Sequence, residues 1–292
     1  MSSKNIGLLI LLSAIWGGSF IFMRVLAPVF GAVGTANIRL LIGAAFLLVI
    51  YQFTGYHIHW RRDWKLLFVI GVINSAIPFS MFAYAALHIP ASISVVINSM
   101  TPMFGAIFEG LLLKTQFTKS KISGLIIGAI GVAIISGSKS LPGTRESYLA
   151  IMACILATFC YGLAGALIKK YGQRLESKAL AGGSQLFAGL ALLPFLLSSG
   201  INAPVTLNVA GMALVFGILC SAIAYLIYFY LIKEMGPTPA LSVTFLMPVF
   251  GILWSSLLLG EAIYPEMILG AAVILVGIFM IVKPKKVNLA NT

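Results

Sequence analysis

The chain is a succession of long apolar stretches of about 20 residues, separated by short polar connections. A helix needs roughly that length to cross the hydrocarbon core of a bilayer. The pattern therefore predicts ten membrane-spanning helices, at residues 6–26, 33–53, 66–86, 92–113, 121–137, 147–168, 179–198, 207–231, 239–260 and 266–282. The connections are rich in glycine and proline and leave no room for a separate soluble domain.

The pattern of residues also occurs twice. Pro248 lies 146 positions after Pro102, which is half of the 292-residue length, and many other positions match at this offset or one less. The chain therefore consists of two five-span repeats, at residues 1–138 and 147–283. Because five is odd, the second repeat enters the membrane from the opposite side, and equivalent helices run antiparallel. Such inverted repeats are typical of secondary transporters, whose site lies at the midplane between the repeats.

Composition and charge agree with an all-α membrane protein. Hydrophobic residues make up 60% of the chain and charged residues 9%, and the mean hydropathy is +1.06. A net charge of +12 could indicate nucleic-acid binding. With the N-terminus in the cytoplasm, however, 15 of the 19 Lys and Arg residues fall on the cytoplasmic side, spread over six segments, and two fall in outer connections. This bias follows the positive-inside rule, places both termini in the cytoplasm and argues against a nucleic-acid partner.

Prolines stand near the middle of two equivalent spans, at Pro102 and Pro248. Proline removes one backbone hydrogen bond and bends a helix. We interpret the two as paired hinges. The alternative is a static kink that only shapes the packing.

Polar and aromatic side chains recur at the same depth in both halves. Helical spacing puts Asn98 on one face with Pro102, and Thr244 on one face with Pro248. We predict a central cavity walled by aromatic rings with a few neutral hydrogen-bonding groups. Its substrate-binding residues would be Trp16, Ser75, Phe79, Phe82, Asn98, Tyr225, Tyr228 and Thr244. The alternative for each residue is that small polar groups merely let helices approach one another.

Charged residues inside the predicted spans are few. Glu109 lies about one turn from the inner end of the fourth span, close to Lys114, and is either a proton carrier or a member of an interfacial ion pair. Arg39 lies inside the second span and either snorkels outward or faces the cavity. Arg24 and Glu261 stand at span ends, where we expect them to be solvated. The spans hold no cluster of metal-binding or catalytic side chains, so we expect no metal, no cofactor and no catalytic residue.

Glycines on the fifth span form a surface suited to close helix packing, namely Gly124, Gly128 and Gly131. This surface packs either on the tenth span or on a second copy of the chain in a homodimer.

Several residues carry a resemblance to a known family: Trp16, Gly17, Ser19 and Arg39 in the first half, and Pro248, Phe250, Gly251, Leu257–Leu259, Gly260, Glu261 and Gly270 in the second. With them the chain resembles the EamA-type transporters of the drug/metabolite transporter superfamily, over essentially its whole length. The resemblance implies ten helices, two EamA units, a cavity bordered by helices 3, 4, 8 and 9, and export of amino acids or related metabolites. Lys114-Thr115 stand where Gly260-Glu261 stand in the second half, so that glutamate has no equivalent.

The sequence predicts an alternating-access carrier of the bacterial inner membrane. It would export small amphipathic metabolites, such as amino acids with apolar or aromatic side chains. The alternative within transport is export of cationic or lipophilic drugs, which a deep carboxylate would have favoured. A membrane-embedded enzyme would need clustered His, Asp, Glu or Cys side chains at one depth. A structural or partner-binding membrane protein has no evident use for an inverted duplication.

Overall fold

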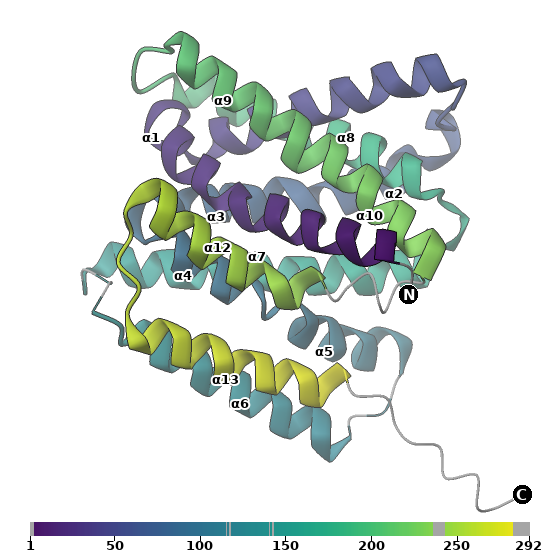
Figure 1. Ribbon diagram of the computed structural model, residues 1–292. Coiled ribbons are helices and arrows are strands. Elements are labelled where there is room, and N and C mark those ends of the chain that lie inside the picture. Colours follow the sequence, from purple (N-terminus) through teal and green to yellow (C-terminus); the bar gives the residue numbers. More distant parts are fainter. Residues whose placement is uncertain are drawn as a thin grey trace, which may run out of the picture.

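Long helices laid side by side form the molecule (Figure 1). The computed structural model describes residues 3–282 except 115, 117, 140, 142 and 236–242, and these residues contain helices and no strand. The helices of the first half are α1 (Ser3–Thr54), α2 (Trp60–Gly71), α3 (Ile77–His88), α4 (Ala91–Asn98), α5 (Thr101–Leu113) and α6 (Lys119–Ser136). Those of the second half are α7 (Arg145–Tyr171), α8 (Ser177–Ser199), α9 (Leu207–Gly217), α10 (Ala224–Met235), α12 (Val243–Leu259) and α13 (Pro265–Val282).

Helices lie at all ten predicted spans, although residues 239–242 of the ninth span lie outside the described residues. Seven helical stretches are long and apolar enough to cross a membrane, and α12 and α13 are shorter apolar helices. The first stretch, α1, has 52 residues and supplies two spans, because it breaks at Gly31 with φ +69° and ψ 173°. Glycine takes such a conformation without a steric cost, and the chain turns back there (Figure 1).

Helices α6 and α13 show the inversion of the two repeats. They are equivalent fifth helices and lie side by side at one edge of the bundle (Figure 1). A Cβ atom on Gly124 would lie 2.5 Å from the Gly277 carbonyl oxygen, and one on Gly131 would lie 2.9 Å from that of Gly270. Positions that rise along α6 therefore meet positions that fall along α13, so the helices are antiparallel. The glycine surface of α6 therefore packs on α13, the tenth span, and a homodimer stays a prediction.

Each repeat also packs its first span against the fourth span of the other repeat. A Cβ atom on Gly17 of α1 would lie 2.9 Å from the backbone nitrogen of Gly251 in α12. At the equivalent contact, a Cβ atom on Gly162 of α7 would lie 2.6 Å from the backbone nitrogen of Gly105 in α5. The two close approaches are related by the repeat offset, and they make the centre of the molecule a surface shared between the repeats.

The third span of each repeat contains a π-helix at the same position. These are η1 (Val72–Ala76), which joins α2 to α3, and η3 (Ile218–Ile223), which joins α9 to α10. π-Helices are rare and often mark functional sites. The apolar pattern of the sequence did not predict them, because one extra residue in a turn leaves no mark on composition.

The two prolines interpreted as hinges stand in different local structures. The chain breaks between α4 and α5, so Pro102 lies in the first turn of α5, where its missing N–H is tolerated. The Oγ1 atom of Thr101 donates to the Asn98 carbonyl oxygen at 2.8 Å, which is the acceptor that Pro102 cannot serve. Helix α12, in contrast, runs unbroken through Pro248. A hinge role stays a prediction for both.

Candidate functional site

Trp16 joins the two repeats at the centre of the molecule. Its ring lies 5.7 Å from that of Tyr225 and 5.3 Å from that of Tyr228, both on α10. Its Nε1 atom donates to the Cys220 carbonyl oxygen in η3 at 3.2 Å. All three residues are partly exposed. The structure thus brings together three of the predicted substrate-binding residues from opposite repeats.

We call the group of Trp16, Tyr225 and Tyr228 the first aromatic junction. A second aromatic junction lies at the place that the repeat offset makes equivalent to it. Tyr161 of α7 corresponds to Trp16, and its ring centroid lies 6.5 Å from that of Phe79 and 6.1 Å from that of Phe82, both on α3. Here the side chains of α3 are closed off, with Phe79 3% and Phe82 1% exposed. Tyr161 itself is partly exposed, so the second junction differs from the first in its two buried phenylalanines, where the first has two partly exposed tyrosines.

Arg39 points into the protein beside these junctions and is 4% exposed. Its Nε atom donates to Ser221 Oγ at 2.9 Å, and its Nη2 atom donates to the Cys220 carbonyl oxygen at 3.2 Å. The guanidinium carbon lies 3.8 Å from the ring centroid of Phe79 and 4.7 Å from that of Phe216. Of the two orientations considered for Arg39, the structure shows the inward one.

The buried charge of Arg39 has no carboxylate partner in the part of the chain that the structure describes. The ion pairs there join Arg62 to Asp63, Lys169 to Glu109 and Arg174 to Asp63. A charge within a membrane protein is costly, and such residues are usually paired or functional. Two hydrogen bonds and two ring contacts offset part of the cost. A guanidinium has five N–H donors, so Arg39 can still bind an anion.

The Cys220 carbonyl oxygen is where two functional candidates converge, because both Trp16 and Arg39 donate to it. It belongs to the π-helix η3. Sequence reasoning named the two donors but not this acceptor.

Gln185 of α8 is a further buried polar residue of this region, 146 positions after Arg39 and 1% exposed. Neither its Nε2 nor its Oε1 atom has a hydrogen-bond partner among the described residues. A Cβ atom on Gly43, one turn from Arg39, would lie 2.7 Å from Gln185 Oε1 and 2.7 Å from Ser221 Cβ. The amide thus lies beside the helical turn that carries Arg39. The repeat offset could have identified Gln185, because it is the equivalent of Arg39.

Three predicted residues lie outside this group. Ser75 is fully buried in η1, Asn98 is 8% exposed at the end of α4, and Thr244 lies partly exposed near the start of α12. The hydrogen bonds of Arg39 and Trp16 go to other residues. The Oδ1 atom of Asn98 has no partner among the described residues.

The charged residues near span ends are bound to protein groups. Glu109 pairs with Lys169 at 3.1 Å, in keeping with an interfacial ion pair, although its partner is not the expected Lys114. The expectation that Glu261 is solvated is wrong. Its carboxylate accepts from the backbone nitrogens of Ala91 at 2.8 Å and Ser92 at 3.1 Å, because the free N–H groups at a helix start attract an anion.

Arg24 is likewise not left to solvent, since it donates to the Ala86 carbonyl oxygen. No group of three or more His, Cys, Asp or Glu side chains that could hold a metal ion occurs within the described residues.

Comparisons with known proteins agree on one family. The sequence model of the EamA-like transporter family matches residues 3–137 and 148–283. An uncharacterized transporter of Archaeoglobus fulgidus is 24% identical, covering 92% of this chain and 95% of that protein. Protein PecM of Dickeya dadantii is 26% identical (91% and 88%), and a probable terminal-alkyne amino-acid exporter of Streptantibioticus cattleyicolor is 21% identical (96% and 93%). One solved crystal structure shares the fold, with a TM-score of 0.67 and 12% identity over 96% of each chain.

Proposed function

The chain belongs to the EamA-like transporter family, and on that premise we propose that it exports amino acids or related metabolites with a carboxylate and an apolar or aromatic side chain. The relative named a probable amino-acid exporter supports this substrate class. The observation that carries the proposal is Arg39, a buried cation without a carboxylate partner among the described residues.

Arg39 binds the substrate carboxylate in this proposal. Its present acceptors are a serine hydroxyl and the Cys220 carbonyl oxygen, both neutral. A carboxylate accepts two parallel hydrogen bonds from a guanidinium, and such charge-assisted pairs are about twice as strong as neutral ones. The substrate therefore competes successfully with the Cys220 carbonyl oxygen for Arg39.

The remaining parts of the substrate meet the first aromatic junction and Gln185. Trp16, Tyr225 and Tyr228 keep exposed ring surface against which an apolar side chain packs. Gln185 has an acceptor oxygen free for an ammonium group and a donor nitrogen free for a carboxylate. An amino acid would satisfy the buried amide and the buried cation together.

Transport follows from the exchange of the two repeats, which we place at residues 1–138 and 147–283. Because the repeats are inverted, swapping their conformations opens the shared surface to the other side of the membrane. The contacts of Trp16 and Arg39 with Cys220 cross between repeats, so substrate release requires them to separate and re-form.

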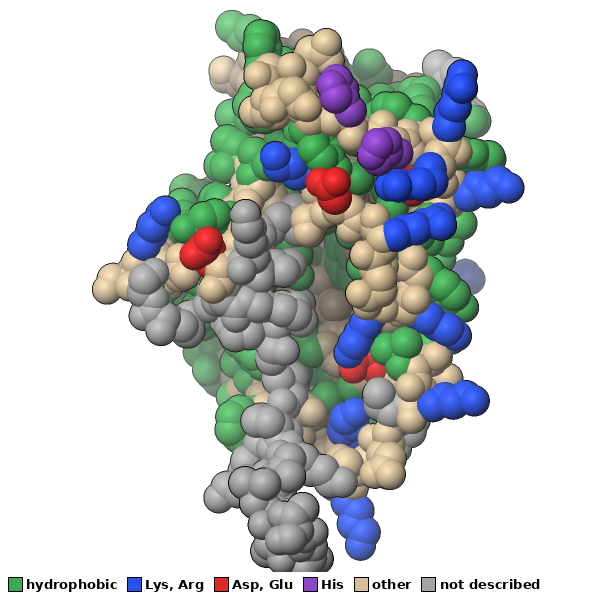
Figure 2. All heavy atoms as spheres, turned by 90° about the vertical axis from the view of Figure 1, so that its right-hand side faces the viewer, with side chains coloured by type: hydrophobic (Ala, Val, Ile, Leu, Met, Phe, Trp, Pro, Cys, Tyr) green, Lys and Arg blue, Asp and Glu red, His purple; other side chains and the backbone are tan. Residues whose placement is uncertain are grey.

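The membrane orientation in this proposal has both termini in the cytoplasm of a bacterial cell, at the inner membrane. Lys and Arg side chains gather over the face of the molecule that carries the N-terminal end of α1 (Figure 2). Cytoplasmic surfaces of membrane proteins carry such an excess. The predicted cytoplasmic Lys283, Lys285 and Lys286 lie outside the described residues.

Export of cationic drugs is not favoured by this arrangement. Arg39 would repel a cation at the junction, and Glu109 is already paired with Lys169. Glu109 thus offers no unpaired carboxylate to a cation in this conformation.

The test is efflux of labelled amino acids from liposomes that contain the purified protein, with and without a pH gradient. We expect efflux of amino acids with apolar or aromatic side chains, and little efflux of their amides, which lack the carboxylate. Efflux that does not depend on the gradient would remove Glu109 as an obligatory proton carrier. Absence of flux for every amino acid tested would contradict the proposed substrate class.

Matched controls keep the result specific. Protein-free liposomes report leakage. The variant Ile126→Ala changes an apolar side chain that is 58% exposed on α6, away from both junctions, and should transport like the wild type.

A further inference from the structure

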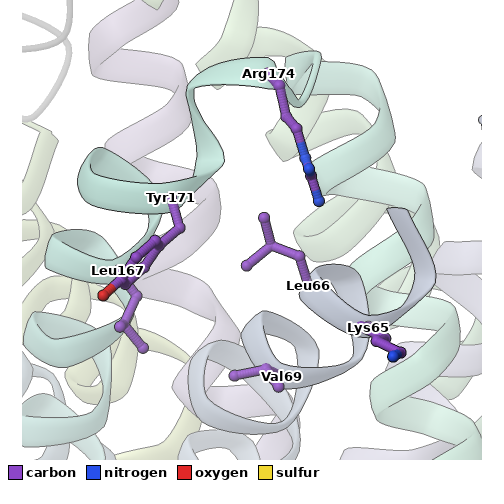
Figure 3. A pocket seen from close by; sticks show the side chains of 6 residues that line it. All are labelled: Lys65, Leu66, Val69, Leu167, Tyr171 and Arg174. Atoms are coloured by element: carbon purple, nitrogen blue, oxygen red, sulfur yellow. The ribbon is translucent and has the colours of Figure 1, made fainter. Parts of the chain in front are cut away.

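A cavity of about 450 Å³ lies between α2 and the end of α7 (Figure 3). It is lined by Lys65, Leu66, Val69, Leu167, Tyr171 and Arg174. In Figure 3, Leu66 and Val69 come from α2 on one side, Leu167 and Tyr171 from α7 on the other, and Arg174 reaches down from above. The cavity is therefore framed by both repeats, because α2 belongs to the first and α7 to the second.

The cavity combines apolar walls with cations. Three of the lining side chains are aliphatic, and Lys65 and Arg174 carry positive charge. Arg174 Nε lies 3.8 Å from Asp63 Oδ1, but the Asp63 carboxylate already accepts two hydrogen bonds from Arg62, at 2.9 and 2.8 Å. Glu176 also interacts electrostatically with Arg62. The residues that line the cavity include two cations and no carboxylate, so its lining is positively charged.

The surroundings place this cavity where a bilayer changes from hydrocarbon to head groups. Trp64 is 47% exposed and Tyr171 is 52% exposed. Exposed aromatic rings beside Lys and Arg are typical of the membrane interface. Farther along α2, Val69 is 43% exposed, so the apolar wall continues in the direction of the acyl chains.

The place that the repeat offset makes equivalent to this cavity lacks these cations. The positions equivalent to Lys65 and Arg174 are Gly211 and Val29. The fold itself therefore does not require a basic pair at this place. Figure 2 shows Lys and Arg side chains gathered on the face of the molecule that it presents.

We infer that this cavity binds one anionic phospholipid of the surrounding bilayer. Its phosphate lies beside Arg174, and one acyl chain runs along Leu66, Val69 and Leu167. The Lys65 side chain points away from the cavity in Figure 3, with Nζ 5.7 Å from the ring centroid of Trp64, and it turns toward the phosphate when the lipid binds. Basic pockets between membrane helices on the cytoplasmic side suit anionic head groups. The ammonium group of a zwitterionic lipid would be repelled by the same cations. Because the lipid contacts α2 and α7, it holds the two repeats in their present arrangement.

The test is native mass spectrometry of the full-length protein titrated with phosphatidylglycerol or phosphatidylcholine. We expect one phosphatidylglycerol to bind in preference to phosphatidylcholine. The double variant Lys65→Ala/Arg174→Ala should weaken phosphatidylglycerol binding about 10- to 30-fold, from the loss of two cations near a head group. The matched control Arg61→Ala/Lys119→Ala removes two exposed cations that do not line the cavity, and should change binding less than about twofold, since surface charges contribute little.

A second variant separates the apolar wall from the charges. Val69→Trp fills the groove without changing charge, and should also lower phosphatidylglycerol binding. Equal losses in the double variant and its control would overturn the inference, as would equal binding of the two lipids. Competition by glycerol phosphate at the concentration of the lipid would assign the cations to a soluble anion and not to a lipid. The measurement needs no transport substrate, so its outcome does not depend on the proposed function.

Discussion

Arg39 and Gln185 occupy equivalent positions in the two repeats but have different surroundings. Arg39 donates two hydrogen bonds into the π-helix of the other repeat, whereas both amide atoms of the buried Gln185 lack a partner among the described residues. Duplication supplies two buried polar positions, and only one has a charge. A symmetric fold can thus hold an asymmetric site, as a substrate with one negatively charged end requires.

The aromatic junctions differ in the same direction. Trp16, on the side of η3, meets two partly exposed tyrosines, whereas Tyr161 meets the fully enclosed rings of Phe79 and Phe82. Both junctions hold the repeats together. The first junction has two partly exposed tyrosines beside Trp16, whereas the second has one partly exposed tyrosine against two buried phenylalanines, and we therefore place the substrate at the first.

The largest effect is expected when the positive charge of Arg39 is removed. Arg39→Leu should lower the transport efficiency of a carboxylate substrate about 100-fold or more, because losing one partner of a buried charged pair costs about 2–5 kcal/mol. Efflux from liposomes at several substrate concentrations measures it. Arg39→Lys serves as the control. It should keep part of the activity, since lysine has the positive charge but lacks the planar guanidinium that donates two parallel hydrogen bonds. Normal efflux by Arg39→Leu would show that the cation is structural.

The next effect separates the two aromatic junctions. Tyr225→Ala should lower transport about 10-fold while leaving membrane insertion intact, because it removes stacking surface worth about 1.4 kcal/mol. Phe82→Ala should act instead on stability, with a loss of about 3–5 kcal/mol typical of a buried ring. Efflux and thermal unfolding in detergent, measured on both variants, give the two readouts. The same profile for both would mean that the junctions are not specialised.

Gln185→Leu should change stability and transport in opposite directions. Removing an unbonded buried amide should stabilise the empty protein by about 1–3 kcal/mol, since the amide pays for desolvation without a hydrogen bond. Loss of one substrate hydrogen bond should lower transport only about 5- to 10-fold. Thermal unfolding and efflux on one preparation measure both. A destabilised variant would indicate that Gln185 has a structural partner.

The smallest effect concerns the ends of the equivalent helices α5 and α12. Lys114 has a positive φ of 55°, and its equivalent Gly260 has 66°. Lys114→Gly should stabilise the protein by about 1 kcal/mol. The left-handed backbone conformation is less favourable by about that much for any residue with a Cβ atom than for glycine. Gly260→Ala should destabilise it by a similar amount. Thermal unfolding midpoints that move the same way in both variants would rule out this explanation.

The sequence was sufficient for the spans and for their inversion. The length of each hydrophobic run identifies a span, and the offset of 146 residues between Pro102 and Pro248 shifts the pattern by five spans, from the fourth to the ninth. Both quantities can be counted without a structure. The sequence also grouped Trp16 with Tyr225 and Tyr228, and the structure brings their rings together; that they wall a substrate cavity stays a prediction.

Features that depend on contact between the repeats could not be predicted. The direction of Arg39 is set by η3, a π-helix without a compositional signal. The role of Glu261 depends on the start of α4, some 170 residues away in sequence. Pro102 and Pro248 look alike in sequence, but only the first is preceded by a threonine whose hydroxyl serves the carbonyl oxygen it leaves unpaired.

The central claim is that Arg39 recognises the substrate carboxylate, and one comparison tests it directly. The ratio of kcat/KM for phenylalanine to that for phenylalaninamide is measured in liposomes for the wild type and for Arg39→Gln. We predict a ratio of about 100 or more for the wild type, from a charged pair worth about 3 kcal/mol, and a ratio near one for the variant. An unchanged ratio in the variant would contradict the claim.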